Sequence, residues 1–523
     1  MFATRFATKR VIWSSQSIRQ KWNNRSTKLR LFPSTSPIEN SAEFNNIEIQ
    51  LNNCHTCTCV SHHKSLKSEN FLKRRVNFAA FHRRYSSYLF TPSAEGEHAA
   101  FIMKPEIDFE TLRIKMKEME DSVKFRSMDV NVEVVISMWD EIQQMEEQKK
   151  QLENERKKIK FRKGDKVSDE DMKKAKAQGR ALREELRTVN SRISELTDQL
   201  YPMALRLPNF LHGDVPLGTD PVELESFTGH GGELKTVRFG KQESHELAHP
   251  GFVYLEDEGA LLEQALLRWA AHQLNKKGFI RFSSPDKFKP IALEALGLDP
   301  DGTNQTYAVK TNEDSTYLTG ASPIAFAAYF MMTVVDATNL PQRCYTVGKH
   351  YNSKNDTGRF DGFHNSFQTN KVEVCGLSEE SIATSDMIFR QYVSLLKDLY
   401  SELPLKCRLL EIPSSQLLPS MYRKCTLEIW LPKTAEYVEA ASVYSCTDYI
   451  SRRLKIRHIG EGEDLTKHKS NRRFVHTVHG QFIDTGVLIE AFQQLAEDTN
   501  EMCIPGTIMS YMPKHSKMSL CNR

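Results

Sequence analysis

The sequence lacks an apolar run long enough to cross a lipid bilayer. A membrane-spanning helix needs about 20 consecutive apolar residues, and the longest run, PIAFAAYFMMTVV at 323–335, is shorter. Charged residues make up 26% of the 523 residues and hydrophobic residues 39%, which is typical of a globular protein. We therefore expect no membrane insertion.

Paired cysteines are also lacking. Seven of the ten cysteines are scattered through the body of the chain, so a disulfide framework is not expected. An N-terminal cluster has the donor types of a metal site, but no second CxxC completes four ligands. Its members are Cys54, Cys57, Cys59, His62 and His63. We expect no metal and no bound cofactor.

Acidic residues are missing from the N-terminus. The first 38 residues contain eight Lys or Arg and no Asp or Glu, which is typical of a mitochondrial transit peptide. A second acid-free patch, 70–90, contains RRYSS, which resembles a mitochondrial processing pattern and would make Ser86 the first mature residue. We interpret 1–85 as a transit peptide that directs the chain to the mitochondrial matrix. The alternative is a disordered basic tail that carries no targeting signal.

Residues 130–200 carry the clearest periodic pattern. Apolar residues recur at three- and four-residue steps on both sides of the polar break KFRKGDKVSDED, which predicts an antiparallel coiled-coil hairpin within an N-terminal region, 86–215. The hairpin tip is basic, which indicates RNA binding, although a dimerising coiled coil with solvated charges is an alternative. The seven basic residues are Arg156, Lys157, Lys158, Lys160, Arg162, Lys163 and Lys166.

The remainder of the chain, 216–523, predicts an α+β domain. It follows the Pro/Gly-marked junction LPNFLHGDVPLG at 207–218. Short β-type runs such as QRCYTVG, KVEVCGL and CTLEIWLP lack a strand-helix-strand rhythm with a Gly-rich turn. The pattern favours an antiparallel sheet with helices packed against it.

The order of these elements resembles seryl-tRNA synthetase, a class II aminoacyl-tRNA synthetase, over roughly 105–515. The most specific segment is CTLEIWLPKTAEYVEAASVYSCTDYISRRLKIR, and HTVHG with IPGTIMSYM resembles the closing segment of the family. The resemblance implies a class II sheet domain, a hairpin arm that contacts serine tRNA, and dimerisation through a helix and strand ending in proline. Here that element is ALLRWAAHQLNKKGFIRFSSP, with Trp269 and Pro285 as interface candidates.

The positions that hold substrates in the family have diverged. Glu439 and Ser442 match the family positions for Mg²⁺ and ATP phosphates. The other positions have lost their functional side chains: the FRxE arginine and glutamate, the arginine of the Gly-Arg pair and its following glutamate, and the TAE segment. The residues that replace them are Asn352, Lys354, Val487, Gln494, Ala321 and Pro323. Loss of charge-stabilising donors slows catalysis by on the order of 10²–10³ each.

From these losses we predict a pseudoenzyme, a non-catalytic mitochondrial paralogue of the family. In this interpretation the chain binds RNA, preferably serine tRNA, and forms a heterodimer with the active mitochondrial seryl-tRNA synthetase; a homodimer is the alternative. Two other hypotheses stay open. In one, Arg359 and Lys349 replace the lost arginines in a diverged but active ligase. In the other, the chain is a matrix scaffold for nucleoid or protease partners.

Overall fold

The computed structural model describes residues 87–90, 103–159, 169–243, 253–300, 302, 306–310, 315–352, 362–460 and 472–513. All of them belong to one compact unit, Phe71–Arg523. Several predictions lie outside the described residues: the transit peptide, the Cys/His cluster, part of the basic tip (Lys160, Arg162, Lys163 and Lys166), and Lys354 and Arg359.

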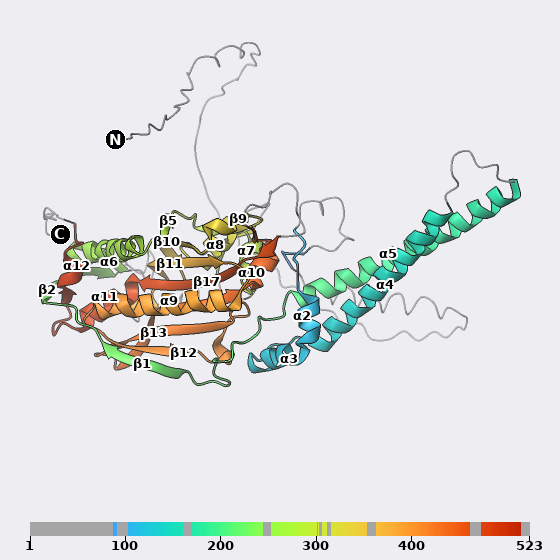
Figure 1. Cartoon of the computed structure of the whole chain (residues 1–523). Coiled ribbons are helices and arrows are strands. Elements are labelled where there is room, and N and C mark those ends of the chain that lie inside the picture. The colour runs from blue at the N-terminus through green and yellow to red at the C-terminus, as the bar shows by residue number, and fades with distance from the viewer. Residues whose placement is uncertain are drawn as a thin grey trace, which may run out of the picture. The chain divides into compact units, whose positions relative to one another are not determined.

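An eight-stranded sheet forms the centre of the fold (Figure 1). Every neighbouring pair of strands is antiparallel except β10 and β5, which are parallel. This antiparallel-rich mixture of helices and sheet confirms the predicted α+β class. The strand order is β1 (Val222–Thr228), β12 (Lys406–Glu411), β13 (Arg423–Leu431), β14 (Glu436–Thr447), β17 (His476–Asp484), β11 (Gln368–Ser378), β10 (Gln342–Tyr351) and β5 (Ile280–Phe282).

Helices cover both faces of this sheet because its strands alternate side chains between two cores. Val372 and Val374 of β11 pack in one core with α6 (Asp257–Lys276), α9 (Ile382–Ser401) and α11 (Thr485–Gln494). Cys375 and Leu377 pack in the other core with α7 (Pro290–Ala295), α8 (Pro323–Phe330) and α10 (Tyr449–Leu454). The short helix α12 (Gly506–Met509) follows the last strand.

Smaller sheets and turns complete this part of the chain. The three-stranded sheets are β16 (Arg473–Phe474), β15 (Arg457–Ile459) and β9 (Val334–Asp336), and β6 (Lys287–Phe288), β8 (Ser315–Leu318) and β7 (Tyr307–Lys310). The two-stranded sheets are β18 (Glu501–Pro505) with β2 (Leu234–Arg238), and β3 (Gly240–Glu243) with β4 (Val253–Glu256). Short 3-10 helices are η3 (Ala337–Asn339), η5 (Phe363–Asn365) and η6 (Ser414–Gln416).

Two long helices, α4 (Val132–Lys158) and α5 (Asp169–Ala204), pack along each other where the hairpin is predicted (Figure 1). Asn131 begins α4 because its side-chain oxygen accepts a hydrogen bond from the Val134 amide at 3.0 Å. Arg192 on α5 pairs with Glu141 on α4 at 2.8 Å. The shorter helices α2 (Phe109–Ile114) and α3 (Met116–Phe125) pack beside the pair. Coiled-coil packing of α4 and α5 stays a prediction.

Trp269, a predicted interface residue, lies in the core instead. Its side chain is fully buried in this chain, and its indole N–H donates to Glu402 at 3.0 Å. Helical periodicity predicted an apolar face on α6 but not which neighbour covers it, and the central sheet, α11 and α12 pack against this helix. Pro285 is exposed after β5. In the described part of the chain, no helix is both long and apolar enough to span a membrane.

A buried polar network joins α3 to the sheet. Arg126 donates to the backbone oxygens of Leu418 and Met421, at 2.6 Å each. The Asn209 amide nitrogen donates to the backbone oxygens of Ser420 at 3.0 Å and Cys446 at 2.9 Å. Burial lowers the pKa of Arg126 to about 10, so the guanidinium is still charged at neutral pH. The network fixes the segment that connects α5 to the sheet.

Replacing Arg126 tests the strength of this network. Arg126→Met keeps much of the volume but leaves the buried Met421 carbonyl without its donor, which costs about 1–3 kcal/mol, whereas the Leu418 carbonyl still accepts from the Met421 amide. We expect the free energy of unfolding to fall by roughly 1–3 kcal/mol in denaturant titrations. Arg113→Met is the matched control, because Arg113 is 56% exposed and forms one exposed ion pair. Equal stability of the two variants would contradict this role.

Candidate active site

A row of polar side chains crosses five neighbouring strands. Thr346 on β10 pairs with Glu373 on β11, which pairs with Gln481 on β17. Gln481 pairs with Ser442 on β14, and Ser442 pairs with Thr426 on β13. Directly paired residues in antiparallel strands share a face, and the exposed fractions of Thr346, Glu373, Ser442 and Thr426 are all at or below 5%. The row is a polar stripe on the α8 and α10 side.

Charged side chains adjoin this polar row. The Lys371 ammonium donates to Gln481 Oε1 at 2.6 Å and pairs with Asp484 Oδ2 at 3.2 Å. The Lys371 and Asp484 side chains are only 12% and 9% exposed. Lys424 donates to both carboxylate oxygens of Glu439 at 3.0 Å, and the Glu439 side chain is 41% exposed. The row thus has an enclosed ion pair and a second pair that solvent reaches.

The two glutamates of the site differ in charge. Burial raises the pKa of the Glu373 carboxyl to about 8, with Lys371 opposing the rise and the Asp484 and Glu439 carboxylates adding to it. Burial also raises the pKa of Glu439, but Lys424 and a hydrogen bond with Ser442 outweigh it, so the net shift is downward. At neutral pH Glu373 is largely protonated and Glu439 is ionised. Such opposed carboxyl groups are common at functional sites.

The segment Thr319–Pro323 packs tightly against β10. Gly320 has φ +64°, and a Cβ there would lie 1.9 Å from the Lys349 oxygen, so only glycine fits. Ala321 is buried and its carbonyl hydrogen-bonds the His350 imidazole at 3.1 Å. Pro323 is the first residue of α8, where its missing N–H is tolerated. Ala321 and Pro323, where the sequence predicts the loss of a substrate-binding glutamate, therefore have roles in backbone packing.

The predicted divergent positions on α11 are structural as well. Val487 is buried in the core beneath the sheet. Gln494 donates to Glu490 at 2.9 Å and accepts from the Lys433 amide at 2.9 Å, which holds the turn between β13 and β14.

Two further positions of the sequence analysis lie at the end of β10. Asn352, directly after this strand, donates through its backbone amide to the Phe367 oxygen at 2.7 Å. The side chain of Lys349 on β10 is exposed.

His479 lies one position further along the same face as Gln481 and is absent from the sequence prediction. It is 1% exposed and stacks on Tyr444, with ring centroids 5.6 Å apart. Burial lowers its pKa to about 3, so the imidazole is neutral. Neither ring nitrogen has a hydrogen-bond partner among the described residues. A neutral ring with free donor and acceptor capacity thus lies at the base of the site.

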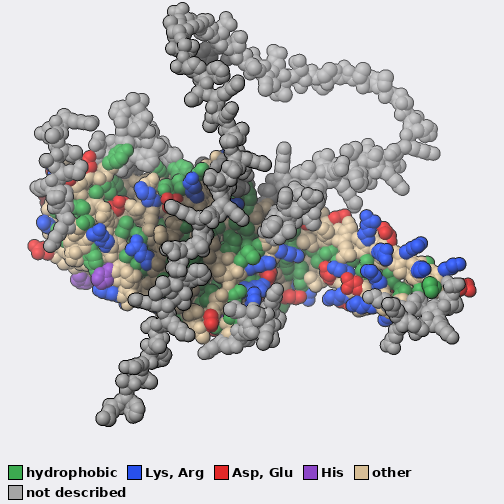
Figure 2. Space-filling model, turned by 90° about the horizontal axis from the view of Figure 1, so that it is seen from above, with side chains coloured by type: hydrophobic (Ala, Val, Ile, Leu, Met, Phe, Trp, Pro, Cys, Tyr) green, Lys and Arg blue, Asp and Glu red, His purple; other side chains and the backbone are tan. Residues whose placement is uncertain are grey.

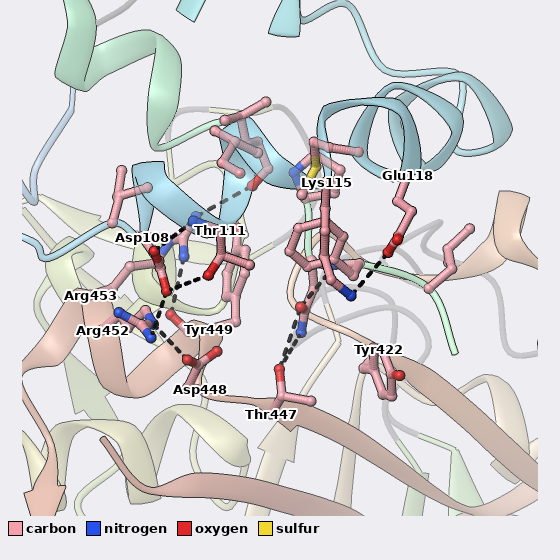
Figure 3. Close-up of a pocket in the computed structure, with 18 of the residues that line it drawn as sticks. Asp108, Thr111, Lys115, Glu118, Tyr422, Thr447, Asp448, Tyr449, Arg452 and Arg453 are labelled. Atoms are coloured by element: carbon pink, nitrogen blue, oxygen red, sulfur yellow. Dashed lines mark hydrogen bonds and ion pairs between the residues drawn. The ribbon is translucent and has the colours of Figure 1, made fainter. Parts of the chain in front are cut away.

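A cavity of about 430 Å³ lies between α2, α3 and α10 (Figure 3). Arg452 crosses it and pairs with Asp448 at 2.5 Å and Asp108 at 3.2 Å. Lys115 and Glu118 pair at 3.2 Å on its other side. None of the five residues of the polar row lines this cavity. It is a separate hollow in which the described charged side chains largely pair with one another.

The chain is similar to curated serine–tRNA ligases. No family model matches the chain. The mitochondrial serine–tRNA ligase of Mus musculus is 28% identical over 469 residues, covering 84% of this chain and 88% of the relative. That of Bos taurus is 27% identical over 468 residues, covering 83% and 87%. The serine–tRNA ligase of Borrelia recurrentis (strain A1) is 26% identical over 426 residues, covering 77% and 97%.

Solved structures show the same fold. The seryl-tRNA synthetase from Pyrococcus horikoshii, complexed with ATP, has a TM-score of 0.67 at 22% identity and covers 78% of this chain and 98% of its own. The cytoplasmic serine–tRNA ligase from Naegleria fowleri, in complex with AMP, has a TM-score of 0.64 at 16% identity and covers 78% and 97%. The fold is that of a seryl-tRNA synthetase, and the curated relatives named above are serine–tRNA ligases.

The pseudoenzyme prediction is corrected by these comparisons. The relatives are ligases, and ligases are enzymes, so the comparisons point to an enzyme. The pseudoenzyme prediction rested on three divergent segments and left out the neighbouring KVE, which contributes Lys371 and Glu373. It also missed Lys424, Gln481 and Asp484, because strand pairing brings them together from distant segments. The alternation of polar and apolar residues within each strand was the sequence signal that could have found these residues.

The protonation of Glu373 predicts a pH dependence of stability. Its folded-state pKa of about 8 exceeds the ordinary value of 4.5. The folded chain therefore holds this proton more tightly, and the resulting stability is fully present below about pH 4.5 and is lost as pH rises through about 8. Glu373→Gln cannot titrate. We expect the melting temperature of the wild type to fall relative to this variant between about pH 5 and 8.5.

The control for this comparison is Glu436→Gln, which changes an exposed glutamate on β14. Its melting temperature should follow that of the wild type across the range. If the wild type and Glu373→Gln give parallel curves, Glu373 does not hold a proton in the folded state.

Proposed function

We propose that this chain is a diverged mitochondrial serine–tRNA ligase, which couples ATP cleavage to the attachment of an amino acid to tRNA. The observation that carries the proposal is the polar row, with Lys371, Glu373 and Asp484 enclosed in the sheet. Enclosed charges are costly unless paired, and clustered groups with shifted pKa values favour a functional site. The likeness to mitochondrial ligases over 84% of the chain supports the same reaction class.

The residues of the row suit the charges of this reaction. Glu439 is ionised and reached by solvent, and Ser442 adjoins it. A single carboxylate together with substrate phosphates is a common way to bind Mg²⁺. Lys371 and Lys424 supply positive charge to phosphate oxygens, which are stabilised most strongly in an enclosed site. Protonated Glu373 and the Gln481 amide then offer neutral hydrogen bonds to the amino acid.

Pyrophosphate exchange tests this activity. With ATP and serine, or another amino acid from a full panel, we expect exchange above a no-enzyme blank. Lys371→Met should lower it by at least about tenfold, because a charge that stabilises the transition state is lost. Lys397→Met, which changes a lysine paired with Glu225 on the opposite face, is the control and should keep wild-type activity. No exchange with any amino acid would contradict the proposal.

A basic stripe on α5 supports tRNA binding. Its residues recur at three- and four-residue steps, which places them on one helix face over about 20 Å. All are exposed, and no described carboxylate is within ion-pair distance of any of them. By contrast, Lys149 and Lys150 on α4 pair with glutamates. The stripe consists of Lys173, Lys176, Arg180, Arg183 and Arg187.

These residues extend the predicted basic tip along the hairpin. Arg156, Lys157 and Lys158 are exposed at the end of α4. Figure 2 shows Lys and Arg side chains gathered on this part of the molecule. Unpaired cations along a helix suit the phosphate backbone of a duplex RNA arm, which proteins bind mostly by shape and charge.

Neutralising the stripe tests the RNA contact. Replacing all five residues by Gln keeps helix propensity and removes the charges. We expect affinity for a mitochondrial serine tRNA, measured by fluorescence anisotropy, to fall at least about tenfold and the salt dependence to weaken by about one unit of slope per lost contact. Lys149→Gln with Lys150→Gln is the control. Unchanged affinity and salt slope in the five-site variant would show that the stripe is only solvated.

The chain is also proposed to dimerise through the edge strand β5. Ile280 on β5 is 58% exposed, and Tyr329 and Met332 nearby are 64% and 67% exposed. An open sheet edge with exposed apolar groups favours pairing with a second chain. The hypothesis of a heterodimer with an active ligase depended on an inactive site in this chain. Because this chain is now proposed to be active, a second copy of it is the preferred partner at β5.

Light scattering of the purified protein tests this interface. We expect a dimer, and we expect Ile280→Asp to shift it to a monomer because a charge is then placed in an apolar contact. Met387→Asp, on an exposed position of α9, is the control. Co-expression with a differently tagged mitochondrial seryl-tRNA synthetase distinguishes the partners. A mixed species in place of the homodimer would contradict the proposal and restore the heterodimer hypothesis.

A further inference from the structure

Two aromatic side chains lie on the sheet face that carries the polar row, near the turn between β13 and β14. Trp430 on β13 pairs directly with Tyr437 on β14. Their ring centroids are 5.0 Å apart with planes at 61°, and both residues are half-buried. Trp430 is four residues from Thr426 of the row, and alternate residues of a strand share a face, so the aromatic pair lies about 13 Å along the same face.

Two cations from β12 contact these rings. The Arg408 guanidinium carbon is 3.9 Å from the Tyr437 ring centroid, and the Lys406 ammonium is 5.4 Å from the Trp430 ring centroid. Arg408 also pairs with Glu428 at 2.6 Å. Lys406 is exposed, and no described carboxylate lies within ion-pair distance of it. Aromatic faces attract cations, so positive charge is held beside partly exposed rings. We name this surface the aromatic platform: Lys406, Arg408, Trp430 and Tyr437.

The same face is closed at the other end of these strands. Leu410 on β12 pairs through β13 with Thr426, and Tyr444 on β14 lies one position beyond Ser442 on this face. Leu410 and Tyr444 are buried in the core that contains α7, α8 and α10. Among the described residues, β12, β13 and β14 are therefore covered at that end and open to an extended ligand at the platform.

The platform has the chemistry of a site for single-stranded nucleic acid. Nucleobases stack on aromatic rings and on the planar guanidinium of arginine, and an exposed lysine attracts backbone phosphates. In the proposed reaction the amino acid is attached to the 3′-terminal ribose of tRNA, and the last nucleotides of tRNA are unpaired. When that ribose lies at the polar row, the nucleotides before it cross the neighbouring surface.

We propose that the aromatic platform binds the unpaired 3′ end of tRNA, with a base stacked on the exposed part of the Trp430–Tyr437 pair and Lys406 at a phosphate. The inference rests on the proposed function, because it assigns a place to one part of that substrate. The basic stripe on α5 contains cations without aromatic side chains, which suits a duplex. The platform combines both, which suits unpaired nucleotides.

Affinities for intact and trimmed tRNA test the proposal. A mitochondrial serine tRNA, and the same RNA without its unpaired 3′ nucleotides, are labelled at the 5′ end and titrated with the full chain by fluorescence anisotropy. For the wild type we expect trimming to weaken binding at least about fivefold, because stacking is lost. Trp430→Leu should bind intact tRNA at least about fivefold more weakly, and trimming should then have little further effect.

Tyr254→Leu is the matched control for the loss of an aromatic side chain. Tyr254 is 59% exposed on β4, which belongs to a different sheet. This variant should respond to trimming as the wild type does. Lys406→Gln changes an exposed side chain and should lower the salt dependence of intact tRNA binding by about 0.7 of a unit of slope. The salt dependence for trimmed tRNA should not change.

Cross-linking of the wild type covers the case in which Trp430→Leu fails to fold. A photoreactive base is placed in the unpaired 3′ end of the tRNA, and the cross-linked peptides are identified by mass spectrometry. We expect them to contain the platform residues of β12, β13 or β14. Cross-links confined to other elements would overturn the proposal.

The binding measurements have further outcomes that would overturn the proposal. These are no affinity for either RNA, equal affinity of the wild type for the two, or an undiminished effect of trimming in Trp430→Leu. Loss of ATP binding in that variant, with the effect of trimming unchanged, would overturn it by assigning the platform to the base of ATP. The tRNA titrations contain neither ATP nor amino acid. Absence of pyrophosphate exchange would therefore contradict the proposed ligase function without contradicting the platform.

Discussion

The register of five antiparallel strands is the constraint on which the site depends. Direct pairing places Thr346, Glu373, Gln481, Ser442 and Thr426 side by side, although they lie far apart in the sequence. A slip of one residue in any strand would turn its polar member toward the opposite core. The apolar packing of α6, α9 and α11 against that opposite face therefore fixes the site as firmly as any contact within it.

This register also explains how charged groups survive in an enclosed position. Lys371 lies opposite Asp484 in the β11–β17 pairing and forms an ion pair with it, while Glu373 stays largely protonated. Enclosing two ionised carboxylates and one lysine would leave an unpaired charge, and the raised pKa of Glu373 avoids that cost. Glu439 stays ionised because Lys424 and a hydrogen bond with Ser442 outweigh the effect of burial on its pKa. The enclosed part of the site thus holds one ion pair and a largely protonated carboxyl, and the solvent-exposed part holds a second ion pair.

Much of the fold was predictable from the sequence, because periodicity reports which face of an element is covered. Strand alternation predicted the antiparallel sheet, and three- and four-residue steps predicted the helices that became α4 and α5. Periodicity does not name the covering neighbour, which is why Trp269 was predicted at an interface and lies in the core. It also does not show which strands pair, so Lys424 and Asp484 were missed. Some positions, such as Pro323 and Gln494, were interpreted only by the catalytic side chain that they lack. In the structure Pro323 begins α8 and Gln494 hydrogen-bonds the turn between β13 and β14, and the sequence did not reveal these roles.

The central claim is that the polar row still binds the reactants of amino-acid activation. Calorimetric titration of the purified chain with a non-hydrolysable seryl-adenylate analogue tests it most directly. The account predicts saturable binding at one site per chain, weakened at least about tenfold by Glu439→Gln, which removes an ionised carboxylate beside Ser442. Absence of binding to the wild type, or equal binding to the variant, would contradict it.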